Sequence, residues 1–123
     1  MMRIGVDIVN ISDIEKLLKT NKGTSKVYSD EEMKLMNGVI YEKRLKHLAG
    51  RFAVKEATLK ALGTGVSEGI GFKDIETFNE ENGRPILILH NAASKIALEL
   101  GINEYNVSIS YAKDYAIAMV VLI

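Results

Sequence analysis

The sequence predicts an α+β fold in which an antiparallel sheet, built from hairpins, packs against one long helix. Three features of the chain lead to this prediction. A helical pattern runs from about Tyr41 to Leu62 and stops at Gly63, a residue that suits the end of a helix. Apolar residues alternate along residues 2–9, as in a half-buried strand. Strand-like segments flank turns at Asn82-Gly83 and Lys113-Asp114, which predicts two hairpins.

In the first half of the chain, capping and turn signals divide the helices. Either Asn10 or Ser12 can cap the first helix, and Asn21 to Gly23 should break it. Ser29 and Glu32 have the spacing of a capping box, so a second short helix should follow. The expected elements are a strand over residues 2–9, helices from about Ser12 to Lys19 and Asp30 to Met36, and the long helix.

The second half should contain the two hairpins and one more helix. Gly65, Gly69 and Gly71 predict a loop after the long helix. The chain shows no repeat, low-complexity tract or linker, so residues 1–123 are expected to form a single domain. The expected elements are strands at Phe72 to Phe78 and Ile86 to Leu89, a helix from about Ala92 to Leu100, and strands at Tyr105 to Tyr111 and Tyr115 to Leu122.

Composition excludes several classes of function. Basic and acidic residues balance at 16 each, so no global field attracts nucleic acid or an anionic membrane, and any anion binding must be local. The absence of cysteine excludes disulfides, thiolate zinc sites and thiol nucleophiles. No apolar run approaches the roughly 18 residues that span a bilayer. The N-terminal segment has no leader-type cleavage pattern. We therefore expect a cytoplasmic protein without a membrane or nucleic-acid partner.

The most informative feature is a pair of charged residues within the apolar stripe of the long helix. A helix turns by about 100° per residue, so residues three and four apart share a face. Glu56 and Lys60 fall in the arc formed by apolar residues, which are Leu45, Leu48, Ala49, Phe52 and Leu59. Charges that face the core are costly unless they are paired. The sequence therefore predicts that both charges serve chemistry, with an ordinary i,i+4 surface pair as the simpler alternative.

Asp7 is a carboxylate in the middle of the predicted N-terminal strand, between Val6 and Ile8. It is either a solvent-facing strand residue or a metal ligand held on a rigid element. Mg²⁺ takes oxygen ligands and commonly uses one or two carboxylates together with substrate phosphates. If the strand packs beside the long helix, Asp7 and Glu56 would form such a pair, and Lys60 would face a phosphate or a departing group.

Two further features could serve a ligand. Gly63, Thr64 and Gly65 could form only a helix end and turn, or could let a ligand approach the backbone. They are not a P-loop, because no lysine follows the second glycine. A local basic run could be a solvated helix face or could collect phosphates, and it consists of Lys43, Arg44, Lys46, His47 and Arg51. The only other histidine, His90, stands apart, so neither a histidine metal cluster nor a Ser-His triad is expected.

Three motifs occur in order along the chain. They are GVDIVNI (Gly5 to Ile11), RFAVKEATLKALGTG (Arg51 to Gly65) and SISYAKDYAIAMVV (Ser108 to Val121), with DIE (Asp74 to Glu76) and NGRP (Asn82 to Pro85) between them. They resemble the G-x-D-I start, the R-F-A-A-K-E-A-x-x-K-A-x-G-T-G centre and the S-x-S-H-x-x-x-Y-A-x-A-x-V ending of the holo-acyl-carrier-protein synthases. These are small bacterial phosphopantetheinyl transferases, and the resemblance covers essentially the whole chain.

The resemblance implies an enzyme of fatty acid biosynthesis. It would transfer 4′-phosphopantetheine from coenzyme A to a serine of apo acyl carrier protein and release adenosine 3′,5′-bisphosphate. Asp7 and Glu56 would hold Mg²⁺ against the coenzyme A pyrophosphate, where the ion neutralises developing charge. Glu56 would also help to deprotonate the serine, and Lys60 would stabilise or protonate the leaving bisphosphate.

The resemblance also implies a 4′-phosphopantetheinyl transferase-like fold that assembles as a homotrimer with the active site at the trimer interface. The turn Gly63–Gly65 would line the coenzyme channel. Arg51 and Arg44 would face the 3′-phosphate of coenzyme A. Ser110 and Tyr111, in the third motif, would come from a neighbouring chain and close over the nucleotide.

Two positions depart from the family pattern. The histidine that usually follows S-x-S is Tyr111 here, which can donate a hydrogen bond but has no cationic form near neutral pH. The family often carries an arginine six residues after the strand aspartate, and this position is Asp13 here. Carrier docking would then use other cations: Lys16, Lys19, Lys22 or Arg44. Both departures favour an alternative, a non-catalytic coenzyme A- or carrier-binding module. A structural trimer without a ligand is a third hypothesis, which the charged stripe disfavours.

Overall fold

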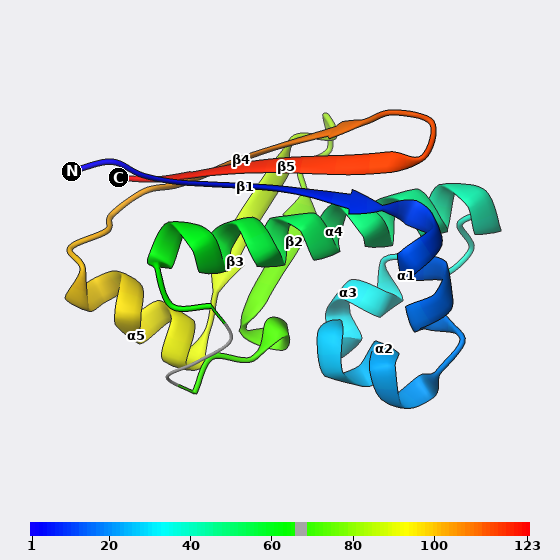
Figure 1. Cartoon of the computed structure of the whole chain (residues 1–123), viewed down its shortest axis with the longest axis horizontal. Helices are drawn as coiled ribbons and strands as arrows, with labels where there is room; N and C mark the ends of the chain where they lie inside the picture. Colours follow the sequence, from blue (N-terminus) through cyan, green and yellow to red (C-terminus); the bar gives the residue numbers. More distant parts are fainter. Residues whose placement is uncertain (66–68) are drawn as a thin grey trace.

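The computed structural model describes residues 1–65 and 69–123, and its helices and strands follow the predicted α+β class (Figure 1). In chain order the elements are β1 (Arg3–Asn10), α1 (Ile11–Leu18), α2 (Asn21–Val27), α3 (Asp30–Lys34), α4 (Tyr41–Leu62), the 3₁₀ turn η1 (Phe72–Asp74), β2 (Ile75–Asn79), β3 (Pro85–Leu89), α5 (Asn91–Glu99), β4 (Tyr105–Tyr111) and β5 (Tyr115–Leu122). The long helix α4 has both of its predicted ends. Positions 66–68, in the loop predicted after α4, lie outside the described residues.

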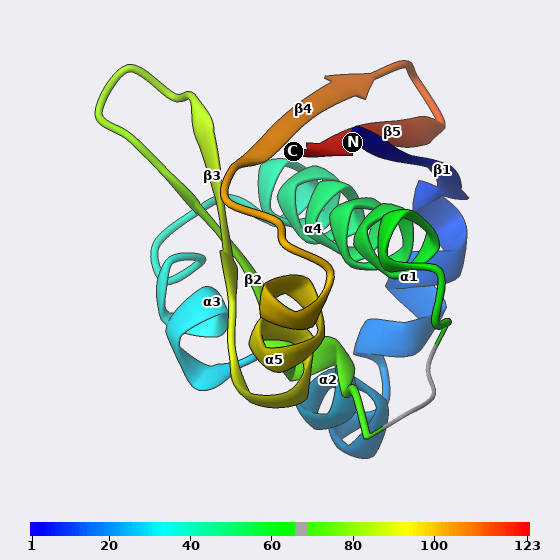
Figure 2. The same cartoon turned by 90° about the vertical axis from the view of Figure 1, so that its left-hand side faces the viewer.

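The strands form two antiparallel sheets. One has the strand order β1-β5-β4, and the other is the β2–β3 hairpin. Both predicted hairpins are therefore confirmed, but they do not share one sheet. Figures 1 and 2 show α4 running along the three-stranded sheet, with the hairpin crossing its flank at a steep angle. The short helices α1, α2 and α3 gather at one end of the molecule, and α5 lies at the other.

Small residues let β1 and β5 lie directly on α4. Ala57 of the helix and Ala116 and Ala118 of β5 are completely buried. Gly5 of β1 makes the closest approach, because a Cβ built on it would lie 1.8 Å from the carbonyl oxygen of Ala57. Any larger residue would push the strand away from the helix. Gly5 therefore sets the spacing at which Asp7, two residues further along, meets α4.

Local capping fixes the short helices α1 and α3. Of the two predicted caps of α1, Asn10 is the one observed, and its side chain accepts a hydrogen bond from the backbone N–H of Ser12 at 3.1 Å. The predicted capping box of α3 is confirmed, with Ser29 and Glu32 each accepting a hydrogen bond from the other's backbone N–H at 3.1 Å. Both helices thus begin where short-range sequence signals place them.

Two predicted boundaries are wrong. Asn21 to Gly23 do not break a helix, because Thr20 caps a new one, α2, by accepting a hydrogen bond from the Gly23 N–H at 3.1 Å. The strand predicted from Phe72 begins only at Ile75, since the residues before it form the 3₁₀ turn η1. The side chain of Lys55 holds this turn by donating to the Phe72 carbonyl at 2.9 Å.

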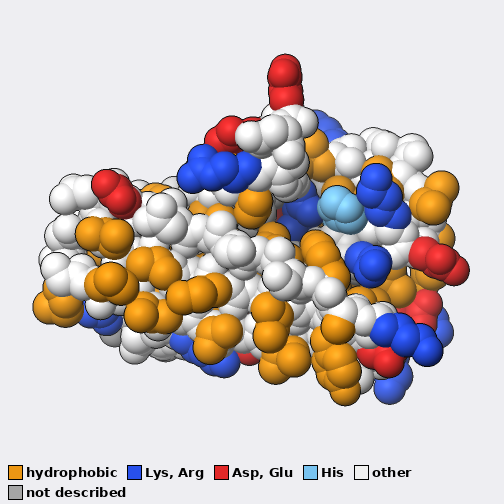
Figure 3. Space-filling view, turned by 90° about the horizontal axis from the view of Figure 1, so that it is seen from above, with side chains coloured by type: hydrophobic (Ala, Val, Ile, Leu, Met, Phe, Trp, Pro, Cys, Tyr) orange, Lys and Arg blue, Asp and Glu red, His pale blue; other side chains and the backbone are white. Residues whose placement is uncertain are grey.

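The outer face of the three-stranded sheet is apolar and exposed. Every second pair across β1 and β5 lies on this face, and its exposed apolar residues are Ile4, Val6, Ile8, Tyr115, Ile117 and Met119. Figure 3 looks onto the molecule from this side and shows hydrophobic side chains gathered along it. A contiguous exposed apolar surface of this kind marks an interaction site more often than a solvated face.

Candidate active site

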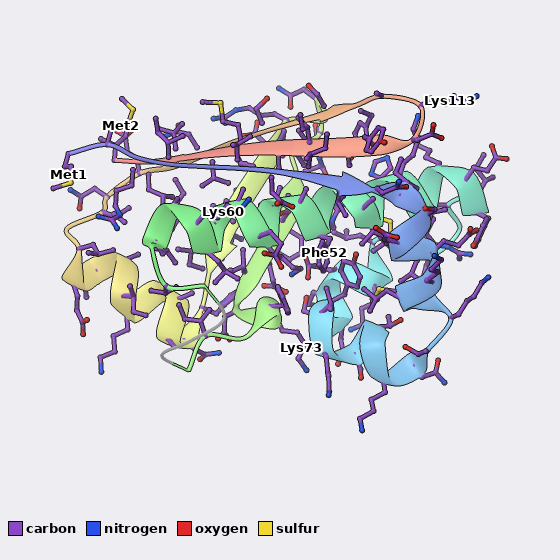
Figure 4. All side chains as sticks on the ribbon, in the orientation of Figure 1. Met1, Met2, Phe52, Lys60, Lys73 and Lys113 are labelled. Carbon is purple, nitrogen blue, oxygen red and sulfur yellow. The ribbon has the colours of Figure 1, made fainter. Side chains whose placement is uncertain are left out.

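The contact between β1 and α4 brings together the three residues that the sequence assigned to catalysis. The ammonium Nζ of Lys60 lies 3.0 Å from Oδ1 of Asp7 and 3.0 Å from the carbonyl oxygen of Val6. Figure 4 shows Lys60 reaching from α4 toward β1. Glu56 lies one helical turn before Lys60, close enough to Asp7 for the two carboxylates to interact electrostatically. We call Asp7, Glu56 and Lys60 the candidate catalytic cluster. Because β1 is an edge strand, this cluster is open to solvent along one side.

The carboxylate of Glu56 lies in surroundings that disfavour its charge. Burial raises the pKa of Glu56, the charge of Asp7 raises it further, and Lys60 opposes the shift. Within residues 1–65 and 69–123, no hydrogen bond engages this carboxylate. A carboxylate with a raised pKa and an available oxygen is suited to accept a proton from a hydroxyl group.

Asp7 and Glu56 offer two carboxylate ligands to a hard divalent cation. In the part of the chain that the structure describes, no group of three or more His, Cys, Asp or Glu side chains could hold a metal ion. Two carboxylates that repel each other suit an ion that takes its other ligands from water and substrate phosphates, as Mg²⁺ commonly does. Among the described residues, this donor set therefore fits Mg²⁺, which would take its remaining ligands from water and substrate.

The prediction that Glu56 and Lys60 fall within a core-facing apolar stripe of α4 is wrong. Lys60 is exposed, with 56% of its side chain accessible, and Glu56 is partly exposed. The sheet, the hairpin and the short helices all pack on α4, so its buried residues do not form a single stripe. The charged side chains that α4 buries are instead Arg51 and Lys55, with exposed fractions of 3% and 0%.

Lys55 is a buried cation that the sequence did not reveal. Its Nζ donates to Oε1 of Glu32 at 2.7 Å and to the Phe72 carbonyl at 2.9 Å, and it also donates to the Ile75 carbonyl. Burial lowers the pKa of Lys55, and Glu32 opposes this effect. The second oxygen of Glu32 accepts a hydrogen bond from the Thr77 N–H at 3.3 Å. No local signal predicts the pair, because its partners are 23 residues apart.

Near the buried Lys55–Glu32 pair, Ser29 and His90 bind different oxygens of the Glu76 carboxylate. The exposed fraction of Glu76 is only 7%. The carboxylate separates the serine from the histidine, so the imidazole cannot act as a base toward that hydroxyl group. The arrangement links α3, β2 and the start of α5, and it is not a catalytic triad.

The turn Gly63–Gly65 closes the end of α4 beside β1. Gly63 adopts the left-handed conformation, with a φ of 80°, which confirms the predicted helix cap. Arg3 of β1 reinforces this end, because its Nε donates to the Ala61 carbonyl at 2.8 Å and its Nη2 to the Leu62 carbonyl at 3.2 Å. A cation at the C-terminus of a helix is favoured by the helix dipole. The turn is thereby held on the same strand that carries Asp7.

Arg51, which the sequence assigned to a phosphate, lies on another part of α4. Its Nε donates to the Thr77 carbonyl at 3.1 Å, and its Nη2 donates to Oδ1 of Asn79 at 2.9 Å. Burial lowers the pKa of Arg51, and the negative charge of Glu32 opposes this effect. Arg51 lines two adjoining cavities between α4 and the β2–β3 hairpin.

Tyr111, another predicted ligand residue, lines the smaller of these cavities together with His47. The centroids of the two rings are 6.5 Å apart. Tyr111 can lie against α4 because Gly50 has no side chain, and a Cβ on Gly50 would come within 2.4 Å of the tyrosine hydroxyl. Lys46 lies over the tyrosine ring, with Nζ 5.8 Å from the centroid. The structure thus joins Arg51, Tyr111 and part of the basic run in one place.

Arg44 and Ser110 do not join either group within a single chain. The Arg44 guanidinium lies 5.6 Å from the centroid of the Tyr41 ring. Ser110 lies on the outer face of the three-stranded sheet, opposite Ile117. The candidate catalytic cluster and the Arg51–Tyr111 cavities are also separate, since Arg51 and Glu56 lie about 7.5 Å apart along α4 and about 140° apart around it.

Comparison with known proteins gives a consistent match over nearly the whole chain. The family model that matches residues 3–120 describes the 4′-phosphopantetheinyl transferase superfamily. A holo-[acyl-carrier-protein] synthase of Desulfovibrio desulfuricans is 46% identical over 121 residues, which are 97% of this chain and 94% of that protein.

Solved structures share the fold. The holo-[acyl-carrier-protein] synthase of Neisseria meningitidis matches with a TM-score of 0.88 and 32% identity, over 98% of this chain and 97% of that one. The synthase of Helicobacter pylori, solved in complex with coenzyme A, matches with a TM-score of 0.83 and 32% identity, over 98% of this chain and 99% of that one.

Proposed function

Since the chain belongs to the 4′-phosphopantetheinyl transferase superfamily, we infer that it transfers the 4′-phosphopantetheine group from coenzyme A to a serine of apo acyl carrier protein. Adenosine 3′,5′-bisphosphate is the leaving group. The main support for this proposal is that Asp7, Glu56 and Lys60 lie close together where β1 contacts α4. A proton acceptor and a cation at one place are what the attack of a hydroxyl on a pyrophosphate requires.

We propose a distinct role for each residue of the catalytic cluster. Asp7 and Glu56 would hold Mg²⁺, which when bound supplies positive charge against the pyrophosphate of coenzyme A. Glu56 would also accept the proton of the carrier serine, directly or through a bound water, as the serine oxygen attacks the phosphorus. Lys60 stabilises the negative charge of the departing bisphosphate.

The alternative of a non-catalytic binding module is not favoured. A module that only binds coenzyme A or a carrier protein does not need a carboxylate with a raised pKa beside a second carboxylate and a lysine. The relatives that cover nearly the whole chain are named as synthases. The departures at Tyr111 and Asp13 affect residues away from this cluster.

We further propose that coenzyme A binds between two chains. The Gly63–Gly65 turn would line its channel, and the cavities at Arg51 would take its 3′-phosphate. The separation of these cavities from Glu56 along α4 supports a site in which one chain supplies the catalytic cluster and a neighbour supplies Arg51 and Tyr111. Ser110 would then lie at the interface, because it is exposed on the outer face of the sheet.

The exposed apolar face of the three-stranded sheet supports a homotrimer. Val6 and Ile8 on β1 have exposed fractions of 54% and 59%, and Met119 on β5 has 46%. Burying such a face between chains is favourable. We expect light scattering to give a mass of three times the 13.6 kDa of one chain. A mass of one chain at the concentrations used for assays would contradict the trimer.

The same proposal implies a surface that binds the carrier protein and a compartment in which the reaction takes place. Lys19 and Lys22 are exposed on and beside the short helices near Asp13, and they could face an acidic carrier. Of the helices within the described residues, none combines the length and apolarity needed to cross a membrane. We propose that the protein acts in the cytoplasm, as a single domain, in fatty acid biosynthesis.

A mass assay on apo acyl carrier protein tests the transfer directly. We expect the carrier to gain the mass of one phosphopantetheine when coenzyme A and Mg²⁺ are both present. Adding a chelator should stop the reaction, and excess Mg²⁺ should restore it. A folded protein that leaves the carrier mass unchanged would refute the function for that carrier, whereas activity that resists the chelator would refute only the metal assignment.

A further inference from the structure

Two adjoining cavities meet at His47 and Arg51. Both are also lined by Asn79 and Gly83 of the β2–β3 hairpin. Their volumes are about 350 Å³ and 140 Å³, and Tyr111 lines the smaller one. In the view of Figure 3, a histidine and basic side chains lie together beside the hairpin. The combined space suits a phosphate group attached to part of a nucleotide.

The groups that face His47 are cationic or uncharged. The charged and titratable ones are Lys43, Lys46 and Arg51 on α4 and Tyr111 on β4. The hairpin contributes the uncharged residues Asn79 and Gly83. The chain before α4 contributes apolar side chains, which are Leu35, Met36 and Val39. Among the described residues that line either cavity there is no carboxylate, so the space attracts an anion.

We infer that His47 takes up a proton from solvent when a phosphate monoester enters this cavity, and that it thereby favours ligands that carry such a group. The inference rests on the proposed function in taking coenzyme A as the ligand, since its 3′-phosphate is a phosphate monoester. Phosphates within a pyrophosphate linkage lack the second ionisation of a monoester near neutral pH and would not produce this effect.

The electrostatic surroundings of His47 explain the coupling. Burial lowers the pKa of His47, and the cations Arg51, Lys43 and Lys46 lower it further, so the free protein favours the neutral imidazole. A phosphate dianion reverses the local potential and favours the imidazolium, which can donate a hydrogen bond to it. Burial raises the pKa of Tyr111, so the phenol remains a neutral donor throughout.

The direction of the pH effect follows from this proton uptake. The complex holds a proton on His47 that the free protein lacks, so affinity should increase as the pH falls from about 8.5 to about 6.5. Below about pH 6 the phosphate itself becomes protonated, and the trend should end.

Calorimetry with coenzyme A and with 3′-dephospho-coenzyme A tests the inference on the intact protein. Coenzyme A should bind about tenfold more tightly at about pH 6.5 than at about pH 8.5, with proton uptake that approaches one at the lower pH and falls toward zero at the higher pH. Dephospho-coenzyme A keeps the pyrophosphate and should bind with less than about a twofold pH effect. His47→Gln should remove the pH dependence for coenzyme A, whereas the matched control His90→Gln should retain it.

The outcomes separate this inference from the proposed function. A pH dependence that persists in His47→Gln, or that is equal for the two coenzymes, would overturn the role of His47 while leaving the transfer reaction intact. Coenzyme A binding with the expected proton uptake, but without transfer to the carrier tested, would support the role of His47 and overturn the proposed function for that carrier. An absence of coenzyme A binding would overturn both.

Discussion

Replacing Asp7 by Asn, or Glu56 by Gln, should lower the rate of phosphopantetheine transfer by a factor of about 10²–10⁴ while leaving the protein folded. Each substitution removes one of the two carboxylates at the β1–α4 contact. In the proposed mechanism, the Glu56 variant also lacks the acceptor for the proton of the attacking serine. The measurement is the initial rate of mass gain on apo carrier protein at saturating coenzyme A and Mg²⁺.

Stability measurements distinguish a catalytic loss from a folding defect. The partner of Asp7, Lys60, is more than half exposed, so losing the pair should cost no more than about 1 kcal/mol. The raised pKa of Glu56 means that its ionised form is disfavoured in the folded chain, and stability is lost as the pH rises through that pKa. Glu56→Gln should therefore be at least as stable as the parent protein near neutral pH.

The control for both variants is Glu99→Gln, which changes an exposed carboxylate on α5. It should retain the parent rate and stability. Full activity in either Asp7→Asn or Glu56→Gln would remove that residue from the proposed mechanism. An equal loss in the Glu99 control would show that the assay reports something other than the catalytic cluster.

Replacing Lys55 by Met should lower the free energy of unfolding by about 3–5 kcal/mol. The substitution leaves the Glu32 carboxylate buried without its cation and removes the donor to the Phe72 and Ile75 carbonyls. A buried charge without a partner costs more than a buried pair contributes. Denaturant unfolding with a linear extrapolation measures the loss.

Two further variants test whether the loss of stability in Lys55→Met comes from the burial of its ion pair. Lys34→Met breaks the exposed pair with Glu31, in which both side chains are about two-thirds accessible, and should cost less than about 1 kcal/mol. Adding Glu32→Gln to Lys55→Met should recover part of the loss, since no isolated charge then remains. If Lys55→Met costs no more than Lys34→Met, the buried pair does not stabilise the fold.

Short-range signals account for the elements that could be predicted from the sequence. The extent of α4, its glycine cap and the capping box at Ser29 and Glu32 depend on neighbours within a few residues. The cap of α2 at Thr20 is also local, but Gly23 within this helix is typical of a helix break, so the sequence predicts no helix there. The splitting of the strands into two sheets depends on how the hairpin packs, which no local pattern contains.

The candidate site was partly predictable for a different reason. Asp7, Glu56 and Lys60 could be proposed together because the motifs that contain them are specific, and the structure places them at one contact. Lys55 stands next to Glu56 in the same motif, yet its burial depends on Glu32 and on the η1 turn, both distant in sequence. An amphipathic-stripe argument assumes one buried face, and α4 has several.

Each residue of α4 must keep its direction around the helix axis, which limits insertions and deletions in this part of the chain. Lys55 and Glu56 are neighbours, yet one is locked into the interior by three hydrogen bonds and the other faces the β1 contact. Inserting or deleting one residue between Gly50 and Lys55 would turn the two parts of the helix by about 100° relative to each other. Either Tyr111 would then no longer pack against Gly50, or Lys55 would no longer reach its hydrogen-bond partners. Across lineages, this stretch should therefore tolerate changes of side chain but not of length.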